Sequence, residues 1–204
     1  MTYGELKRRV LEMVFSYSIA GTQIPASYNN QADYEGMIPG LVNQAEIDIA
    51  TTAKRIYEVV PVSDLEQIEI NNRVRYKLPS DCWIPLASGL LLDAPGRRPM
   101  RYGSVRMLGG KYIELGARAP VEYLSLEYWR YPERVSDETS DDVELDNSPD
   151  VHECIVFYVA AHLLAYDDAY RYTAFMNEYE KQKARLREPL WLEVEPIHNL
   201  YWEG

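Results

Sequence analysis

The sequence is poor in several residue types on which particular protein classes depend. It has two cysteines in 204 residues, Cys82 and Cys154, and both stand in apolar surroundings far apart in the chain. Disulfide-rich scaffolds and structural zinc sites need more cysteines at closer spacing, so we expect two reduced core thiols. No apolar run reaches the roughly 18 residues of a membrane span, and the charged N-terminus lacks the apolar core of a signal peptide. We therefore expect a soluble protein, made in the cytoplasm and without membrane contact.

Basic residues are also scarce. The chain has 21 lysines and arginines against 32 aspartates and glutamates, which gives a formal net charge of −11. Affinity for nucleic-acid phosphate comes mostly from Lys and Arg, so this balance argues against a protein that reads nucleic acid. From Glu133 to Glu153 there are nine acids and one base, Arg134, so the local net charge is −8. Such a run is typical of a solvated loop, and a functional acidic surface is the alternative. The candidate residues of that surface are Asp137, Glu138, Asp141, Asp142 and Glu144.

Motifs for catalysis and for phosphate or metal binding are absent as well. The chain has no G-x-S-x-G, no G-x-x-x-x-G-K-[ST] and no dinucleotide fingerprint after a predicted strand. His152-Glu153 resembles the start of a zinc-protease motif, but Val156 occupies the position of the second histidine. His162 lies on an apolar helix face, where a core histidine is the expected role. We predict no catalytic residue, no metal site and no cofactor.

The chain is organised around residues 148–187. Ser148-Pro149-Asp150 is typical of a helix start, because a serine or aspartate side chain accepts hydrogen bonds there and the missing N–H of proline is no loss. Apolar residues then recur every three to four positions as far as Tyr166. Asp167-Asp168 interrupts this face, and a second apolar face follows. The pattern predicts a helix hairpin, with a single bent helix as the alternative.

Two further helices are predicted in the first quarter of the chain. Thr2 and Glu5 have the spacing of a capping box, and the apolar face behind them predicts a helix that runs to about Ala20. Apolar residues at helical spacing from Ile38 to Ile56 indicate the second helix.

In residues 56–132 the apolar period falls to two, as in strands. Apolar residues occupy even positions from Ile68 to Leu78 and polar residues the odd positions, with Asn71-Asn72 at a turn. This alternation predicts a half-buried hairpin. Gly109-Gly110 marks a second hairpin. The aromatic residues of this segment are expected to pack in a core, and stacking on sugars is the alternative. They are Trp83, Tyr102, Tyr112, Tyr123, Tyr128, Trp129 and Tyr131.

The order of helices, strands and helices predicts an α+β fold. Residues 1–55 and 133–187 are expected to form a discontinuous helical bundle, with residues 56–132 as an antiparallel β domain inserted into it. Residues 188–204 are expected to form an extended C-terminal arm that is unusually apolar and aromatic for a terminus. Its side chains either fold over the chain's own core or anchor a partner, because Trp and Tyr dominate interface energetics. The candidate anchors are Trp191, Leu192, Ile197, Tyr201 and Trp202.

Several short motifs occur in one particular order. The first helix carries Tyr3-Gly4-Glu5-Leu6-Lys7-Arg8-Arg9-Val10, the second carries Val42-Asn43-Gln44-Ala45, and a strand ends in Tyr76-Lys77-Leu78-Pro79-Ser80-Asp81. Glu127-Tyr128-Trp129-Arg130-Tyr131-Pro132 follows, and after the acidic link come Ala165-Tyr166-Asp167-Asp168-Ala169 and Tyr179-Glu180. With this order, over residues 3–187, the chain resembles the head-to-tail adaptor proteins of tailed bacteriophages, also called connector or head completion proteins.

The resemblance implies a structural virion protein of the neck and not an enzyme. It implies a ring of about twelve copies under the portal, so the implied partners are the portal, tail or neck proteins and other copies of the chain. Packaged DNA would pass through the ring without specific binding, and an acidic wall that repels phosphate suits such a channel. The implied location is the head-to-tail junction of the virion, assembled in the host cytoplasm.

Two other function classes are compatible with the sequence. A cell-envelope glycan-binding or glycan-cleaving module requires exposed, coplanar aromatic residues beside a cleft that holds a carboxyl group of raised pKa. A monomeric helical regulator requires that the chain does not assemble.

Overall fold

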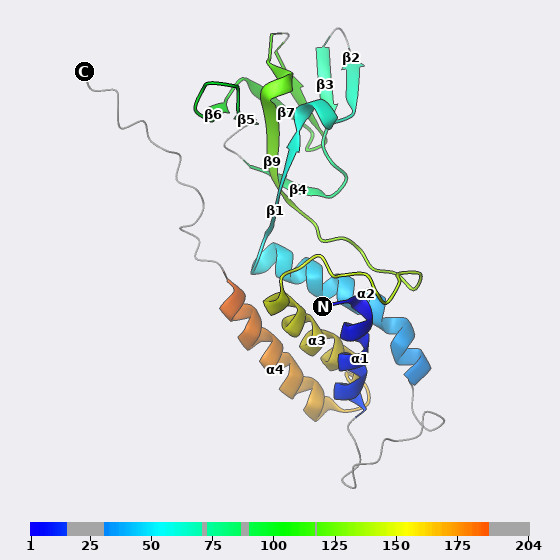
Figure 1. Cartoon of the computed structure of the whole chain (residues 1–204). Coiled ribbons are helices and arrows are strands. Elements are labelled where there is room, and N and C mark those ends of the chain that lie inside the picture. Colours follow the sequence, from blue (N-terminus) through cyan, green and yellow to red (C-terminus); the bar gives the residue numbers. More distant parts are fainter. Residues whose placement is uncertain (16–30, 71–72, 87–89, 117, 188–204) are drawn as a thin grey trace, which may run out of the picture. The chain divides into compact units, whose positions relative to one another are not determined.

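The computed structural model describes residues 1–15, 31–70, 73–86, 90–116 and 118–187 of the chain (Figure 1). These residues divide into two compact units. Residues 1–55 and 132–187 form the helical unit, and residues 56–131 form the β unit. None of the described helices is long and apolar enough to cross a membrane.

The chain is a mixed α and β protein with four described α-helices and two antiparallel sheets. The prediction of a helical bundle with an inserted β element is wrong. The β-rich middle separates the N-terminal helices from the C-terminal helices, and its nine described strands have a hydrophobic core of their own. The sequence pattern indicated two hairpins, but it did not indicate the short strands that complete two sheets. The predicted C-terminal arm, residues 188–204, lies outside the described residues.

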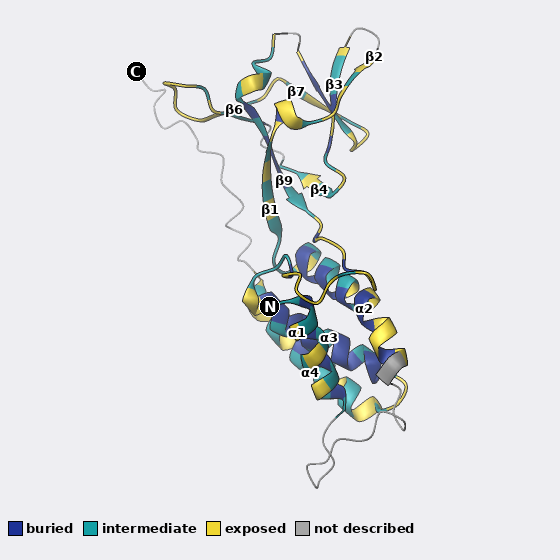
Figure 2. Ribbon diagram, turned by 45° about the vertical axis from the view of Figure 1, so that its right-hand side comes forward, coloured by how far each residue is buried: buried dark blue, intermediate teal, exposed yellow. Residues whose placement is uncertain are grey.

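The helical unit contains α1 (Tyr3–Val14), α2 (Gln31–Thr52), α3 (Pro149–Leu163) and α4 (Ala169–Leu186). α3 packs against each of the other three helices and is buried at nine of its 15 positions (Figure 2). Such a central helix is largely apolar, because little of its surface faces water. The largest buried side chains of this core come from all four helices. They are Tyr3, Leu6, Ile38, Ile49, Ile155 and Tyr179.

Side-chain hydrogen bonds satisfy backbone groups at both ends of α1. The Thr2 hydroxyl accepts a hydrogen bond from the Glu5 N–H at 3.2 Å, and the Glu5 carboxylate accepts one from the Thr2 N–H at 3.1 Å. The predicted capping box is therefore confirmed. At the other end, Arg171 of α4 donates to the Val14 carbonyl at 3.0 Å. α1 is shorter than the predicted helix, whose last residues, up to Ala20, lie outside the described part of the chain.

Residues 148–187 form the predicted helix hairpin and not a single bent helix. α3 ends at Leu163, and α4 begins after Asp168, whose carboxylate accepts the Arg171 N–H at 3.0 Å. Ser148 is the N-cap residue of α3 and Pro149 is its first residue, but the Ser148 hydroxyl makes no capping hydrogen bond. The hairpin is confirmed, whereas the serine side chain does not cap α3.

The β unit consists of two antiparallel sheets. The first has the order β1 (Ile56–Pro61), β9 (Leu124–Arg130), β5 (Leu90–Leu92) and β6 (Met100–Tyr102), and β4 (Cys82–Pro85) also pairs with β9. The second has the order β2 (Gln67–Ile70), β3 (Arg73–Lys77), β8 (Tyr112–Leu115) and β7 (Val105–Leu108). Side chains of both sheets share one core, which includes Tyr76, Leu90, Ile113, Leu124 and Leu126.

Both predicted hairpins are confirmed by strand pairing. Gly109, Gly110 and Lys111 join β7 to β8, and the two glycines have φ values of 58° and 65°. The Lys111 N–H donates to the Leu108 carbonyl at 3.1 Å across these glycines, and glycine adopts positive φ without strain. β2 and β3 pair across residues 71–72, as the alternation predicted.

The register of the first hairpin sets which of its residues share a face. Ile70 pairs with Arg73, so every even position of β2 stands opposite an odd position of β3. Residues directly opposite each other lie on the same face of a sheet. Ile68 therefore shares a face with Arg75, while Tyr76 on the opposite face is buried in the core. The predicted half-buried hairpin is confirmed, because Tyr76 and Leu78 are buried and Val74 is partly buried, while the charged residues Glu69, Arg73 and Lys77 are exposed.

Candidate functional site

An ordered acidic loop, defined as residues 133–147, covers the start of α1. The Tyr3 N–H donates to the Val143 carbonyl at 2.8 Å, and the Gly4 N–H donates to the Asp141 carbonyl at 2.9 Å. The first turn of a helix leaves such N–H groups without partners inside the helix. The acidic loop supplies the acceptors that α1 lacks, and α1 in turn fixes the position of the loop.

α2 holds the two ends of the acidic loop. The Asn43 side chain donates to the Val135 carbonyl at 2.8 Å and accepts the Val135 N–H at 2.9 Å. Both backbone groups of this buried residue are thus satisfied, as they would be by a neighbouring strand. At the other end, the Asn147 amide donates to the Glu46 carboxyl group at 3.0 Å. The loop is therefore anchored at both ends and in the middle.

The close contact between α1 and the acidic loop depends on Gly4. A Cβ atom at this position would lie 2.7 Å from the Cβ of Asp141 and 3.0 Å from its carbonyl oxygen. Such distances are shorter than packed side chains tolerate, so any other residue would displace the loop or the helix. Lys7, one turn further along α1, forms an ion pair with the Asp141 carboxylate.

Four of the five candidate residues of the acidic surface form no ion pair with any described residue. Asp141 is paired with Lys7, and beyond the loop Asp150 is paired with Lys54 at 2.8 Å. The other four candidates for an acidic surface are exposed and form no ion pair with any described residue. They are Asp137, Glu138, Asp142 and Glu144. The structure thus places all five sequence candidates on one ordered loop.

Tyr3 lies at the contact between α1 and the acidic loop. Burial is the main reason why the pKa of its hydroxyl is raised to about 12, and the carboxylates of Asp137 and Asp141 raise it further. Tyr3 therefore stays neutral at physiological pH. The Lys7 ammonium lies 4.8 Å from the centroid of its ring, which is cation–π distance.

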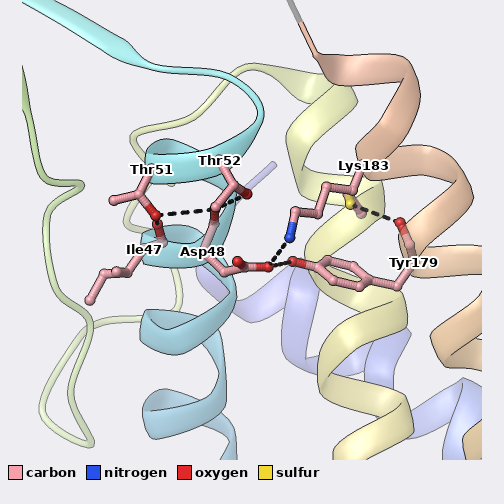
Figure 3. A network of polar contacts seen from close by, with 7 residues as sticks. Ile47, Asp48, Thr51, Thr52, Tyr179 and Lys183 are labelled. Atoms are coloured by element: carbon pink, nitrogen blue, oxygen red, sulfur yellow. Dashed lines mark hydrogen bonds and ion pairs between the residues drawn. The ribbon is translucent and has the colours of Figure 1, made fainter.

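A polar network centred on Asp48 joins α2 to α4 (Figure 3). The Asp48 carboxylate accepts hydrogen bonds from the Tyr179 hydroxyl and, at 2.5 Å, from Lys183 Nζ. Burial by itself would raise the pKa of Asp48, but these donors outweigh it and lower the pKa below its ordinary value. The Lys183 side chain is only 9% exposed, so its charge depends on this pairing. The network therefore stabilises the position of α4 relative to α2.

Two ionisable side chains of the helical unit are buried with incomplete hydrogen bonding. Glu46 is 1% exposed, and its Oε2 has no hydrogen-bond partner among the described residues. Burial raises the pKa of this carboxyl group to about 7. His152 is 2% exposed, and neither of its ring nitrogens has a hydrogen-bond partner in the described part of the chain. Burial lowers the pKa of this imidazole, which favours the neutral form.

The remaining sequence candidates take structural positions or lie outside the described residues. His162 is half-buried, with the rings of Tyr158 and Tyr172 at centroid distances of 4.2 and 5.9 Å. Cys82 and Cys154 are free thiols, as predicted, and burial raises their pKa values to about 11 and 12. Within the described ranges, no group of three His, Cys, Asp or Glu side chains could hold a metal ion. The aromatic-arm candidates are not described: Trp191, Leu192, Ile197, Tyr201 and Trp202.

The β unit contains a cleft of about 540 Å³, which we call the arginine cleft because Arg73 and Arg106 line it together with Glu114. Glu114 is 9% exposed and accepts hydrogen bonds from Arg73 at 2.7 Å and from Arg75 at 3.0 Å. These two donors, Arg73 first, lower the pKa of Glu114 below its ordinary value. A glycan-cleaving site needs a carboxyl group of raised pKa as its general acid, so the cleft has the opposite chemistry.

Comparison with protein families adds the decisive observation. Residues 1–193, nearly the whole chain, match the family described as SU10 adaptor protein. The chain belongs to the SU10 adaptor family. The resemblance to phage head-to-tail adaptors, drawn from the order of the motifs, is thereby confirmed. No curated protein matches the chain.

The motifs that carried the resemblance to phage head-to-tail adaptors contain several of the anchoring residues described above. Gly4 allows the close contact with the acidic loop, Asn43 hydrogen-bonds to the Val135 backbone, and the Tyr179 hydroxyl donates to Asp48. Sequence reasoning missed the arginine cleft, because its groups come from strands far apart in the chain. The arginines at odd positions of β3 were visible, but nothing in the sequence marked Glu114 as their partner.

Proposed function

We propose that this member of the SU10 adaptor family forms a ring that joins the portal of the capsid to the tail and lines part of the channel through which DNA passes. The observation that carries the proposal is the family match over residues 1–193. The anchored acidic loop supports it, because fixed negative charge on a channel wall repels phosphate and lets the DNA move. Tail or neck proteins would bind the face of the ring away from the portal.

The unequal charge of the two units also supports a channel lined by the helical unit. Residues 1–55 and 132–187 contain 19 acidic and 11 basic residues, a net charge of −8. Residues 56–131 contain 9 acidic and 10 basic residues, a net charge of +1. A surface that grips DNA needs an excess of Lys and Arg, so the acidic loop is the better channel lining.

The C-terminal arm is proposed as the anchor of the ring on the portal or on a neighbouring subunit. It contains Trp191, Leu192, Ile197, Tyr201 and Trp202. Buried aromatic anchors at interfaces each contribute about 2 kcal/mol or more, so removing residues 188–204 should weaken portal binding by about 30-fold or more. Biolayer interferometry with immobilised portal measures the change, and unchanged circular dichroism shows that the shortened chain still folds. Undiminished binding would show that the arm does not anchor the ring on the portal.

The position of the protein in the virion tests the proposed function. Gold-labelled antibodies against the chain should bind intact phage particles at the head-to-tail junction, as seen by electron microscopy. An infection in which the protein is not produced should yield heads without attached tails. Label on tail fibres, or normal tailed particles in its absence, would contradict an adaptor function.

A further inference from the structure

β1 is an edge strand with exposed apolar side chains. It pairs with β9 along one side, and no described strand pairs with its other side. Tyr57 and Val59 of β1 are 45% and 40% exposed. The one charged residue of the strand, Glu58, forms an ion pair with Arg130 at 3.2 Å. Proteins protect such an edge with charged residues or cover it with another segment, and β1 lacks the unpaired charge.

The apolar surface continues from β1 across the first sheet. Tyr57 and Ile84 of β4 both stand opposite Trp129 of β9, so the three side chains share one face of the sheet. The rings of Tyr57 and Trp129 have their centroids 5.7 Å apart, and Ile84 is 44% exposed. Val60 and Leu126, which stand opposite each other, belong to the core of the β unit on the other face. The exposed face is therefore a second apolar surface of this sheet, outside its core.

The first part of the C-terminal arm has the sequence pattern of an edge strand. Pro189 and Pro196 bound six residues, which is also the length of β1. Apolar residues occupy every even position between the prolines, and both glutamates occupy odd positions. A period of two is typical of a strand with one apolar face, and proline is tolerated at the ends of an edge strand. The six residues are Leu190, Trp191, Leu192, Glu193, Val194 and Glu195.

The arm leaves the helical unit at the end where β1 begins. Near the start of α2, the Tyr34 hydroxyl donates to Asp167, just before α4. Near the end of α2, Asp48 pairs with Lys183, in the last turns of α4. The two helices therefore run in the same direction and end at the same end of the unit. β1 begins four residues after α2, and residue 190 stands four residues after α4, so each link spans at most about 14 Å.

We propose that residues 190–195 pair with the open edge of β1 in the same chain and extend the first sheet by one strand. The backbone groups of β1 gain partners, and the apolar even positions of the segment lie beside Tyr57 and Val59. Because both strands leave the helical unit at the same end, they run parallel. The part of the arm beyond Pro196 stays available for the portal. The inference concerns a single chain, so it does not depend on the proposed ring.

An intramolecular disulfide tests the pairing in the full-length chain without portal. The variant with Val59→Cys and Leu192→Cys joins the centres of the two strands, where neighbouring Cα atoms lie within disulfide range. After mild oxidation, peptide mass spectrometry should detect a disulfide between positions 59 and 192, and non-reducing electrophoresis should show a single chain. Val59→Cys with Glu193→Cys is the matched control, because position 193 points to the opposite face. Its yield should be about tenfold lower.

Hydrogen exchange of β1 tests the same pairing without added cysteines. Aspartate at the three apolar even positions of the segment should abolish pairing, because it places charges beside the apolar face of β1. The amides of residues 56–61 should then exchange about tenfold faster or more. The control carries three aspartates beyond Pro196 and should leave this exchange unchanged. The test substitutions are at Leu190, Leu192 and Val194, and the control substitutions are at Ile197, Leu200 and Trp202.

The outcomes separate this inference from the proposed function. Equal disulfide yields at positions 192 and 193, or unchanged exchange of β1 in the test variant, would overturn the inference. A disulfide found only between different chains would also overturn it and assign the edge of β1 to the arm of a neighbouring copy. If the chain does not bind the portal, the adaptor function fails. The two measurements are made without portal and still decide the inference.

Discussion

Replacement of Gly4 by alanine should detach the acidic loop from α1. The added Cβ would lie 2.7 Å from the Cβ of Asp141, so the loop or the helix must move. This movement breaks the hydrogen bonds from Gly4 to Asp141 and from Tyr3 to Val143, each with a net contribution of about 1 kcal/mol. Alanine recovers at most about 1 kcal/mol of helix propensity over glycine. The expected result is a loss of about 1–2 kcal/mol in the free energy of unfolding.

The same substitution elsewhere provides a control of opposite sign. Gly36 and Gly40 lie in α2, and a Cβ at either position would have no atom within 4 Å. Alanine at each should therefore raise the free energy of unfolding by up to about 1 kcal/mol. Urea unfolding followed by circular dichroism at 222 nm measures all three variants, and hydrogen exchange at Tyr3 and Gly4 reports the loop contact directly. If Gly4→Ala stabilised the protein as much as Gly36→Ala, the contact between α1 and the loop would be refuted.

Three further changes test other parts of the helical unit by urea unfolding. Asp48→Ala leaves the buried Lys183 ammonium unpaired and should lower the free energy of unfolding by about 2–3 kcal/mol. This is the low end for a buried pair, because the Asp48 side chain is 35% exposed. Lys183→Met in the same chain should restore part of the loss, because it removes the unpaired charge. Asn43→Ala removes both partners of the buried Val135 backbone and should cost about 2 kcal/mol, whereas the exposed neighbour Gln44→Ala should stay within about 0.5 kcal/mol. Glu46 has a folded-state pKa raised from 4.5 to about 7, so the stability it contributes is complete below pH 4.5 and is lost as the pH rises to 7, by about 3 kcal/mol. Glu46→Gln should abolish this part of the pH dependence, and an identical profile in both proteins would contradict the burial argument.

Local patterns predicted the elements of this fold better than their assembly. The capping box at Thr2, the hairpin of α3 and α4, and the glycine turn at Gly109 depend on neighbouring residues, so the sequence alone was sufficient. The grouping of nine strands into two sheets depends on pairings such as that of β1 with β9, which lie far apart in the chain. Alternation within one strand does not contain this information.

The candidate site, too, was only partly predictable from the sequence. The acidic run was evident from composition, but its anchoring was not, because it depends on the absence of a side chain at Gly4 and on the amide of Asn43. The two-residue turn sets even positions of β2 opposite odd positions of β3, which the alternation within one strand does not reveal. The pairing of Glu114 with two arginines of β3 required the register between β3 and β8.

Assembly on the portal is the property on which the functional account depends most directly. Purified chain should be added in excess to the portal protein of the same phage, and the mass of the complex measured by mass photometry, with its symmetry determined by electron cryomicroscopy. We expect one complex of fixed mass in which the chain forms a closed ring on the portal. A portal that keeps its own mass in saturating amounts of the chain would contradict the assignment of this protein as an adaptor ring.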